Sequence, residues 1–330
     1  MLHYDGLIPP LTTVIQGSSD DLSAFVANRG APILLDGGLA TSLESRGMPM
    51  KPPLWTSEAL FTPRWRSALY DIHRDYVVAG ADIITANTFR TGKLILSNIF
   101  SDDTEMSEVV NLAVKIAKKA VESVPRATAL VAGSMAPVAD CYRPDLVPSS
   151  EVAWEHHRWH ARKLAAAGAD ILLCETFNSV SEALIAVQAG VDTGLPVWVS
   201  FVGQGNATLA GESFREVCDE LVSSGAKAIL LNCSTLETTV EFLRVANAHS
   251  HIPYGFYPNN EGRLSTIGSL VEGCCSEHGI VYTCDVLVRR VAELCRKYNV
   301  TIVGGCCGTT PRYIRELHAL MRGRTYNDKL

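Results

Sequence analysis

The chain has 330 residues, of which 47% are hydrophobic and 19% charged, and its formal net charge is -6. This composition is typical of a soluble globular protein and excludes a disordered or fibrous chain. The acidic balance gives no basic surface for nucleic acid or an anionic membrane, so we expect small-molecule partners.

The N-terminal stretch MLHYDGLIPPLTTVIQ has neither a basic start nor a continuous apolar segment. No run approaches the ~20 apolar residues that a membrane span needs, so we expect a cytoplasmic protein without a signal peptide. The chain has 10 cysteines, which in a reducing compartment indicate metal binding or catalysis rather than disulfides. A single free cysteine is nonetheless more often a small buried hydrophobe.

Along the chain, short apolar runs alternate with segments of helical periodicity. The runs are continuous, as is typical of parallel strands buried on both faces. The predicted strands are 33–38, 81–89, 129–134, 169–177, 196–201, 226–234, 252–259 and 300–307. The predicted helices are 57–78, 105–122, 151–166, 180–191, 213–223, 236–248, 284–297 and 311–321. This alternation predicts a (β/α)8 TIM barrel.

Local signals set some of the predicted helix ends. Thr56 is a candidate N-cap of the first helix, and the repeated AGAD places Gly80 and Gly168 at left-handed C-terminal positions. A doubly wound open sheet is the rival fold, but no GxGxxG follows the first strand.

We expect a single domain over 1–330, with an N-terminal arm at 1–30 and the barrel at 31–322. Two connections, after the third and seventh strands, are longer than a barrel needs. Both would leave the C-terminal face, where barrel enzymes keep their active sites, so both are candidate lids.

The ends of the predicted strands are polar and would share one mouth of the barrel. They carry Asp36 with Gly37 and Gly38, Asn87 with Thr88, Ser134, Glu175 with Thr176, Asn232 with Cys233 and Ser234, Asn259 with Asn260, and Cys306 with Cys307.

The three cysteines at these ends belong to the sixth and eighth strands. Three thiolates facing one mouth predict a zinc site with a fourth position left for substrate. Gly304, Gly305 and Gly308 would let the backbone leave strand geometry, so that the adjacent thiols of Cys306 and Cys307 reach one ion. A substrate thiol bound there would be held as a thiolate at neutral pH.

Other functions fit parts of this pattern. Cys306 and Cys307 could form a redox-sensing disulfide, or the three cysteines a structural zinc site without catalysis. In a metal-free barrel lyase, Asp36 and Glu175 would be the acid and base. The combination of three cysteines favours the catalytic metal site.

The motifs LLDGGLATSLESRG (34–47), ANTF (86–89), CETF (174–177), NCS (232–234), YPN (257–259) and VGGCCGTTP (303–311) together resemble the homocysteine S-methyltransferase family. The resemblance spans roughly residues 33–320 and implies a zinc-dependent barrel. It implies a methyl transfer that converts homocysteine to methionine, with S-methylmethionine, betaine, or a methylcobalamin and folate system as donor.

The resemblance also implies roles for individual residues. Cys233, Cys306 and Cys307 would be the zinc ligands, with the substrate sulfur as the fourth. The other implied substrate-binding residues are Asp36 and Glu175 for the ammonium, backbone N–H groups around Gly37 and Gly38 for the carboxylate, Asn232 in the zinc pocket, Thr88 of the ANTF motif, and Trp55, whose ring would attract the donor cation.

The donor is the more open question. Arg90 follows ANTF where the betaine-using branch has an aromatic residue. A fixed cation there would repel a quaternary ammonium and could hold a donor carboxylate, which favours a sulfonium donor. A methylcobalamin donor would require a separate corrinoid protein. The stretch after the third strand lacks the Gly-Asp-Tyr-like pattern of the S-methylmethionine branch, so another thiol or a selenol stays open as acceptor.

Two further clusters have weaker claims to function. His156 and His160 have the i, i+4 spacing of zinc ligands, but no HExxH pattern accompanies them, and we expect surface or packing roles. Cys274 and Cys275 form a second adjacent pair, in the long connection after the seventh predicted strand, where metal binding is disfavoured.

Overall fold

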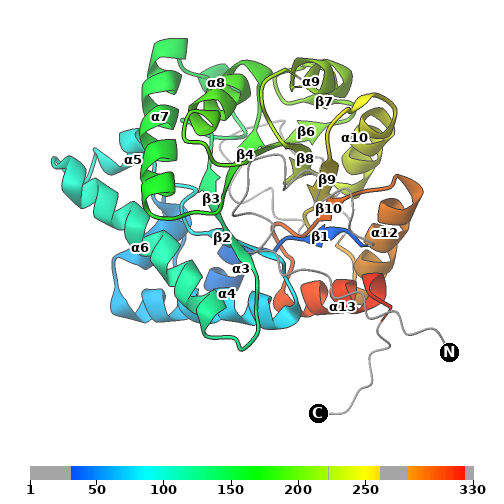
Figure 1. The fold of residues 1–330 in the computed structure, drawn as a ribbon, viewed down its shortest axis with the longest axis horizontal. Helices are drawn as coiled ribbons and strands as arrows, with labels where there is room; N and C mark the ends of the chain where they lie inside the picture. The colour runs from blue at the N-terminus through cyan, green and yellow to red at the C-terminus, as the bar shows by residue number, and fades with distance from the viewer. Residues whose placement is uncertain (1–30, 222, 261–280, 324–330) are drawn as a thin grey trace.

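A barrel of parallel strands forms the centre of the computed structural model, which describes residues 31–221, 223–260 and 281–323 (Figure 1). The sheet has the order β1-β10-β9-β8-β5-β4-β3-β2, and a parallel bridge between Leu35 and Ile83 joins the first strand to the last. The strands are β1 (Ile33–Leu34), β2 (Ile83–Ala86), β3 (Leu130–Met135), β4 (Ile171–Phe177), β5 (Val197–Phe201), β8 (Ala228–Asn232), β9 (Tyr254–Tyr257) and β10 (Ile302–Val303). The predicted (β/α)8 barrel is confirmed.

Helices surround the barrel, and each predicted helical segment contains one. They are α4 (Pro63–Ala79), α6 (Asp103–Glu122), α7 (Ser150–Ala166), α8 (Val180–Val191), α9 (Phe214–Leu221), α10 (Leu236–His249), α12 (Cys284–Lys297) and α13 (Pro311–Met321). The sequence analysis missed the short α3 (Leu39–Ser45) and α5 (Lys93–Leu96), and the hairpin of β6 (Gly203–Gln204) and β7 (Ala207–Thr208). None of the described helices is long and apolar enough to cross a membrane.

The strands are continuously apolar because both of their faces are buried. On β4, Leu173 belongs to the cluster inside the barrel, whereas its neighbour Leu172 belongs to the larger cluster between strands and helices. Trp198 and Val199 divide in the same way on β5. Alternate residues thus fill the two sides of the barrel wall, and the inner cluster supports the strand ends from below.

The predicted glycine positions at helix ends are confirmed: Gly80 ends α4 with φ 99°, and Gly168 follows α7 with φ 85°. The prediction for Thr56 was wrong. Thr56 lies inside a 3-10 helix, Trp55–Leu60, and α4 begins at Pro63 after its N-cap Thr62. The N–H of the first helical residue has no partner inside the helix, and proline lacks this group. Its φ also suits the first helical position, so α4 begins at Pro63.

The connection after β3 covers residues 136–149 and contains a short 3-10 helix, Pro144–Leu146. The predicted arm at 1–30, most of the long connection after β9, and the pair Cys274 and Cys275 lie outside the described residues.

Candidate metal and substrate site

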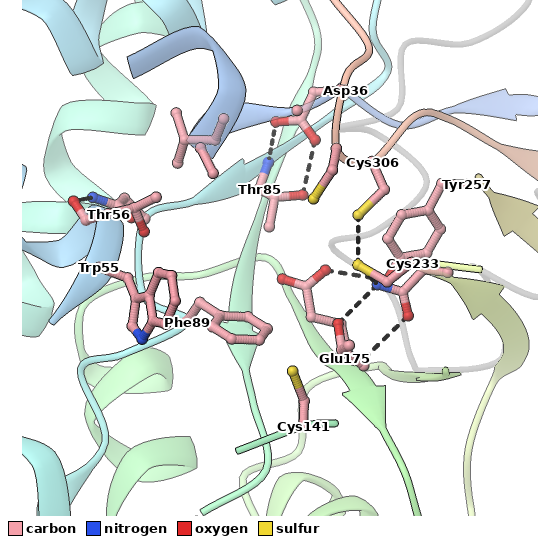
Figure 2. A pocket seen from close by; sticks show the side chains of 18 of the residues that line it. Asp36, Trp55, Thr56, Thr85, Phe89, Cys141, Glu175, Cys233, Tyr257 and Cys306 are labelled. Carbon is pink, nitrogen blue, oxygen red and sulfur yellow. Dashed lines mark hydrogen bonds between the residues drawn. The ribbon is translucent and has the colours of Figure 1, made fainter. Parts of the chain in front are cut away.

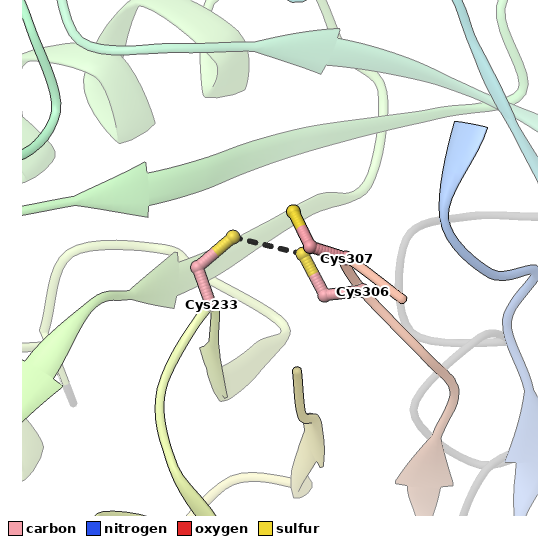
Figure 3. A group of neighbouring side chains, drawn as sticks. All are labelled: Cys233, Cys306 and Cys307. Atoms are coloured by element: carbon pink, nitrogen blue, oxygen red, sulfur yellow. Dashed lines mark hydrogen bonds between the residues drawn. The ribbon is translucent and has the colours of Figure 1, made fainter. Parts of the chain in front are cut away.

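Three cysteines converge at the C-terminal mouth of the barrel. Cys233 directly follows β8, and Cys306 and Cys307 follow β10, with β9 between these two strands. The three sulfur atoms all lie within 4.8 Å of one another (Figure 3). The Cys233 and Cys306 thiols share a hydrogen bond at an Sγ–Sγ distance of 2.8 Å, and all three cysteines are free.

The backbone leaves strand geometry where these thiols are presented. Cys233 has φ 47° and Thr176, at the end of β4, has φ 64°. Residues with a Cβ rarely adopt this left-handed region, and such conformations concentrate at functional sites. The turn at β8 therefore aims the Cys233 sulfur across β9 toward the other two.

The glycines beside Cys306 and Cys307 act differently from the prediction. Only Gly308 has a positive φ, 78°. Gly304 and Gly305 are needed for space, because a Cβ on Gly304 would lie 2.6 Å from Leu35 Cβ and one on Gly305 would lie 2.3 Å from Thr309 Oγ1. Close approach of neighbouring chain segments, rather than backbone rotation, is the physical reason for these two glycines.

Hydrogen bonds from adjoining segments fix the cysteine backbone. The N–H of Cys306 donates to the Pro258 carbonyl at 3.0 Å, and the N–H of Cys307 donates to Asn259 Oδ1 at 3.2 Å. Thr309 Oγ1 donates to the Cys306 carbonyl at 2.7 Å. Residues of the YPN and GTT motifs thus position the thiols.

The thiols form an electrostatically coupled group that favours a thiolate. Hydrogen bonds from Cys233 and Cys306 hold the pKa of Cys307 well below its ordinary value. The same hydrogen bonds to Cys306 and Cys307, with burial, raise the pKa of Cys233. Asn232 Nδ2 lies 3.5 Å from Cys233 Sγ, where its N–H supports negative charge on sulfur.

This donor set fits a thiophilic metal ion. In a tetrahedral site with Zn–S bonds of about 2.3 Å, the ligand sulfurs lie roughly 3.8 Å apart. This value falls between the 2.8 Å of the Cys233–Cys306 pair and the 4.8 Å within which all three sulfurs lie. Soft thiolate ligands favour zinc, copper(I) or iron–sulfur centres over magnesium or calcium. Within the described part of the chain, these cysteines are the only cluster with metal-ligand spacing. The structure therefore supports a metal centre at this mouth.

Two carboxylates share the mouth with the thiols (Figure 2). Asp36 accepts from Thr85, with its Oδ2 2.8 Å from the backbone nitrogen and its Oδ1 3.0 Å from the hydroxyl oxygen. Glu175 accepts from the hydroxyls of Ser134 and Tyr257, the latter at 3.1 Å. Burial raises the pKa of Asp36 to about 7 and that of Glu175 to about 6, against the opposing effect of these hydrogen bonds.

These sulfurs and carboxylates line a cavity of about 200 Å³. The predicted site residues Trp55, Gly37, Gly38 and Asn232 also line it. Trp55 has φ 49°, another left-handed conformation at the site. The cavity thus combines a sulfur cluster, acidic groups and an aromatic ring, as the motifs predict.

Two predicted site residues have other partners. Thr88 is fully buried and is not among the residues that line the cavity. Its hydroxyl donates to the Ser134 carbonyl and accepts from the Ser134 N–H, both at 2.9 Å, because β2 and β3 end side by side. The N–H of Gly38 donates to Thr309 Oγ1 at 3.1 Å. The N–H of Gly37 has no hydrogen-bond partner within the described residues and is therefore the one of the two that can bind a ligand.

The histidines of α7 are buried packing residues rather than surface residues or metal ligands. His160 Nε2 lies 3.1 Å from Thr91 Oγ1, and Leu94 N–H donates to His156 Nδ1 at 3.4 Å. His157 Nε2 lies 3.0 Å from Glu182 Oε1. Burial lowers the pKa of His160 to about 3 and that of His156 well below its ordinary value.

Several residues that line the cavity were not predicted from the sequence. Thr85, in the predicted strand 81–89, and Tyr257, in the YPN motif, orient the two carboxylates. Both look like ordinary strand residues in the sequence, so only the tertiary structure shows their role. Asp140, Cys141 and Tyr142 line the cavity from the connection after β3. Their only signal is that this connection is long and polar.

Comparison with known proteins places this arrangement in context. A family model described as "Homocysteine S-methyltransferase" matches residues 33–321. A homocysteine S-methyltransferase from Escherichia coli is 30% identical over 305 residues, covering 87% of this chain and 94% of the relative. Homocysteine S-methyltransferase 1 from Zea mays is 26% identical, covering 92% of this chain and 98% of the relative.

A similar solved structure is the metallated form of the homocysteine methyltransferase MmuM from Escherichia coli. It superposes with a TM-score of 0.75 at 26% identity, covering 91% of this chain and 99% of that one.

Proposed function

This chain belongs to the homocysteine S-methyltransferase family, and from that premise we propose that it transfers a methyl group from a sulfonium donor to homocysteine at a zinc site. Methyl transfer to homocysteine is the activity that the family and its relatives carry in their names. The observation that carries the proposal is the convergence of three thiols beside two carboxylates in one cavity.

Cys233, Cys306 and Cys307 would hold the zinc ion, and the homocysteine sulfur would complete its coordination. When bound, zinc acts as a Lewis acid that takes the place of a general base and keeps the substrate sulfur as a nucleophilic thiolate. Asn232, Asn259 and Thr309 support the cysteines by hydrogen bonds to their sulfur or backbone atoms.

Asp36 and Glu175 would bind the homocysteine ammonium. Thr85, Ser134 and Tyr257 hold the two carboxylates in fixed orientations at the cavity wall. The N–H of Gly37 is available for the homocysteine carboxylate. Binding the amino-acid head group orients the sulfur toward the donor.

The methyl transfer itself is an in-line displacement. A bond forms between the acceptor sulfur and the methyl carbon while the bond from that carbon to the donor sulfur breaks. The electron pair of the broken bond stays on the donor, which leaves as a neutral thioether. Opposite charges are neutralised in this step, so a cavity poor in water favours it. The aromatic ring of Trp55 would stabilise the donor cation before transfer.

A sulfonium donor is favoured over betaine by Arg90, whose guanidinium lines the same cavity. Arg90 stands where the betaine-using branch has an aromatic residue, and its guanidinium can hold a donor carboxylate. We further propose that residues 31–322 form one domain, because one apolar cluster extends from Leu34 to Leu317.

Zinc-edge X-ray absorption of purified protein, with and without homocysteine, tests the proposal. We expect one zinc per chain, with three sulfur ligands and one lighter ligand that becomes a fourth sulfur when homocysteine is added. Zinc that does not respond to homocysteine would indicate another acceptor or a structural site. Freshly reduced protein that takes up no zinc would overturn the metal mechanism.

A further inference from the structure

The cavity wall contains one buried cation without an anionic partner. Arg90 is 8% exposed and is the only arginine or lysine among the described residues that line the cavity. Its Nη1 donates to the Ala139 carbonyl at 3.0 Å, and its guanidinium carbon lies 5.0 Å from the centre of the Phe89 ring. Within the described residues, Nε has no hydrogen-bond partner and no ion pair involves the side chain.

Such a cation is costly unless an anion joins it. A guanidinium has five N–H donors, and a neutral carbonyl satisfies one of them here. Taking a charged group out of water is unfavourable without a counter-charge. The fork of a guanidinium matches the two oxygens of a carboxylate. Arg90 is therefore prepared for a carboxylate that enters with a ligand.

An acidic residue lines the same wall of the cavity, next to the residue whose carbonyl accepts the hydrogen bond from Arg90. Asp140 directly follows Ala139 and lines the same cavity. Its Oδ1 accepts from the N–H of Tyr142 at 2.9 Å. Its carboxylate makes no ion pair with Arg90, so the two charges are held apart on one wall.

The segment that carries Asp140 is fixed from behind. The N–H of Val138 donates to Glu182 Oε1 at 2.7 Å, and Asn178 Nδ2 donates to the Cys141 carbonyl at 3.1 Å. Both partners belong to the start of α8 or the residues just before it. The position of Asp140 relative to Arg90 is thus set by the fold before any ligand binds.

We propose that Arg90 and Asp140 bind the α-carboxylate and α-ammonium groups of the methyl donor and are its specificity-determining residues. This rests on the proposed function and assigns the donor head group to residues distinct from Asp36 and Glu175. One cavity then holds two amino-acid head groups, each at its own charged pair, and the two sulfur atoms meet between them. A donor that lacks either head-group charge binds less tightly.

Equilibrium binding to the zinc-loaded protein tests the assignment, with homoserine present to fill the acceptor position without reacting. The probes are S-methylmethionine, its α-carboxamide, and the analogue without the α-amino group. The wild type should bind each analogue about 10- to 100-fold more weakly than S-methylmethionine, as for loss of a hydrogen bond to a charged group.

The variants separate recognition from a structural role. Arg90→Gln should remove the preference for the carboxylate over the carboxamide and keep the preference for the amino group, whereas Asp140→Asn should do the reverse. Arg90→Lys, which keeps the charge, should retain part of the carboxylate preference. If Arg90→Gln weakens all three probes by one factor, or if the wild type does not discriminate among them, the assignment is wrong.

Methyl transfer, measured as methionine formed from homocysteine and S-methylmethionine, tests the proposed function separately. Selective binding without methionine formation would overturn the sulfonium-dependent activity and leave the recognition by Arg90 and Asp140 intact. Methionine formation, with wild type and Arg90→Gln showing the same selectivity among the three probes, would support the sulfonium-dependent activity and overturn the recognition by Arg90. A wild type that binds glycine betaine more tightly than S-methylmethionine would overturn both.

Discussion

Glu175 illustrates how a single side chain combines two demands. Hydroxyl groups of Ser134 and Tyr257 fix its orientation, while burial raises its pKa to about 6. A ligand ammonium that enters the cavity favours the ionised form further, because an opposite charge nearby lowers a carboxyl pKa. The affinity of Glu175 for a cation therefore depends on its negative charge. Replacing the carboxylate by an amide removes that charge and hardly changes the shape of the side chain.

Replacing Glu175 by Gln is accordingly expected to raise the KM for homocysteine about 10- to 100-fold, the loss typical of a charge-assisted hydrogen bond. Zinc content should stay near one per chain, because the cysteines are unaffected. Steady-state kinetics and metal analysis measure the two effects. Glu155→Gln, an exposed change on α7, is the matched control and should alter neither. Loss of zinc in Glu175→Gln would contradict the placement of this residue at the substrate.

At the scale of one element, α7 is the support for two cavity-forming connections. His156 and His160 contact the segment after β2, and His157 contacts Glu182, which holds the segment after β3. The Thr91 hydroxyl donates to the Thr88 carbonyl at 3.0 Å, so His160 Nε2 must be the donor to Thr91. Burial lowers the pKa of both His156 and His160, so these two imidazoles are neutral at pH 7.

This predicts an acid-sensitive fold. The pKa of His160 is about 3 in the folded protein and about 6.5 when unfolded. Above pH 6.5 both states are neutral. Below it the unfolded state takes up a proton that the folded state does not, so the free energy of unfolding falls by about 1.4 kcal/mol per pH unit for this group.

His160→Gln should therefore lose stability less steeply between pH 6.5 and pH 5, by about 1.4 kcal/mol per pH unit relative to wild type. Urea unfolding at pH 7.5, 6 and 5 measures the difference. Contributions from Asp36 and Glu175 have the opposite sign and cancel in the comparison. Parallel pH profiles for the two proteins would mean that His160 takes up its proton as readily in the folded state as in the unfolded state, and would contradict the prediction.

At the scale of the whole molecule, the sulfur cluster lies directly above the barrel core, and Cys306 packs against the inner apolar cluster. The inner apolar cluster fills the barrel below the mouth, while the three cysteines lie on segments that follow the strands. A metal at the mouth would add to the stability of a structure that already has a full core. Its contribution would follow from mass action, since the ion binds the folded state.

Removing the metal with a chelator is therefore expected to lower the Tm, on the order of 10 °C for an ion present at about a thousand times its dissociation constant. Far-ultraviolet circular dichroism at 25 °C should not change. Thermal scans of zinc-loaded and chelated protein make the comparison. A chain that loses its helical signal on chelation would show that the metal is needed for folding itself.

The strands and helices were predictable because a strand that is buried on both faces has a continuous run of apolar residues. The sulfur cluster was predictable because cysteines at strand ends must share the mouth of a parallel barrel. The roles of Thr88 and Gly305 were not, since contacts to Ser134 and Thr309 decide them. The burial of His156 and His160 likewise depends on where the segment after β2 folds back, which no local pattern records.

The residues of this cavity lie on two kinds of segment. The thiols and the two carboxylates beside them stand at or next to strand ends, whereas Arg90 and Asp140 stand on connections whose lengths the barrel does not dictate. Substitutions at Arg90 and Asp140 can therefore alter the donor side of the cavity without changing the segments that carry the thiols. Variants that accept other methyl donors would be sought at these two positions, and the residues at the strand ends would be kept unchanged.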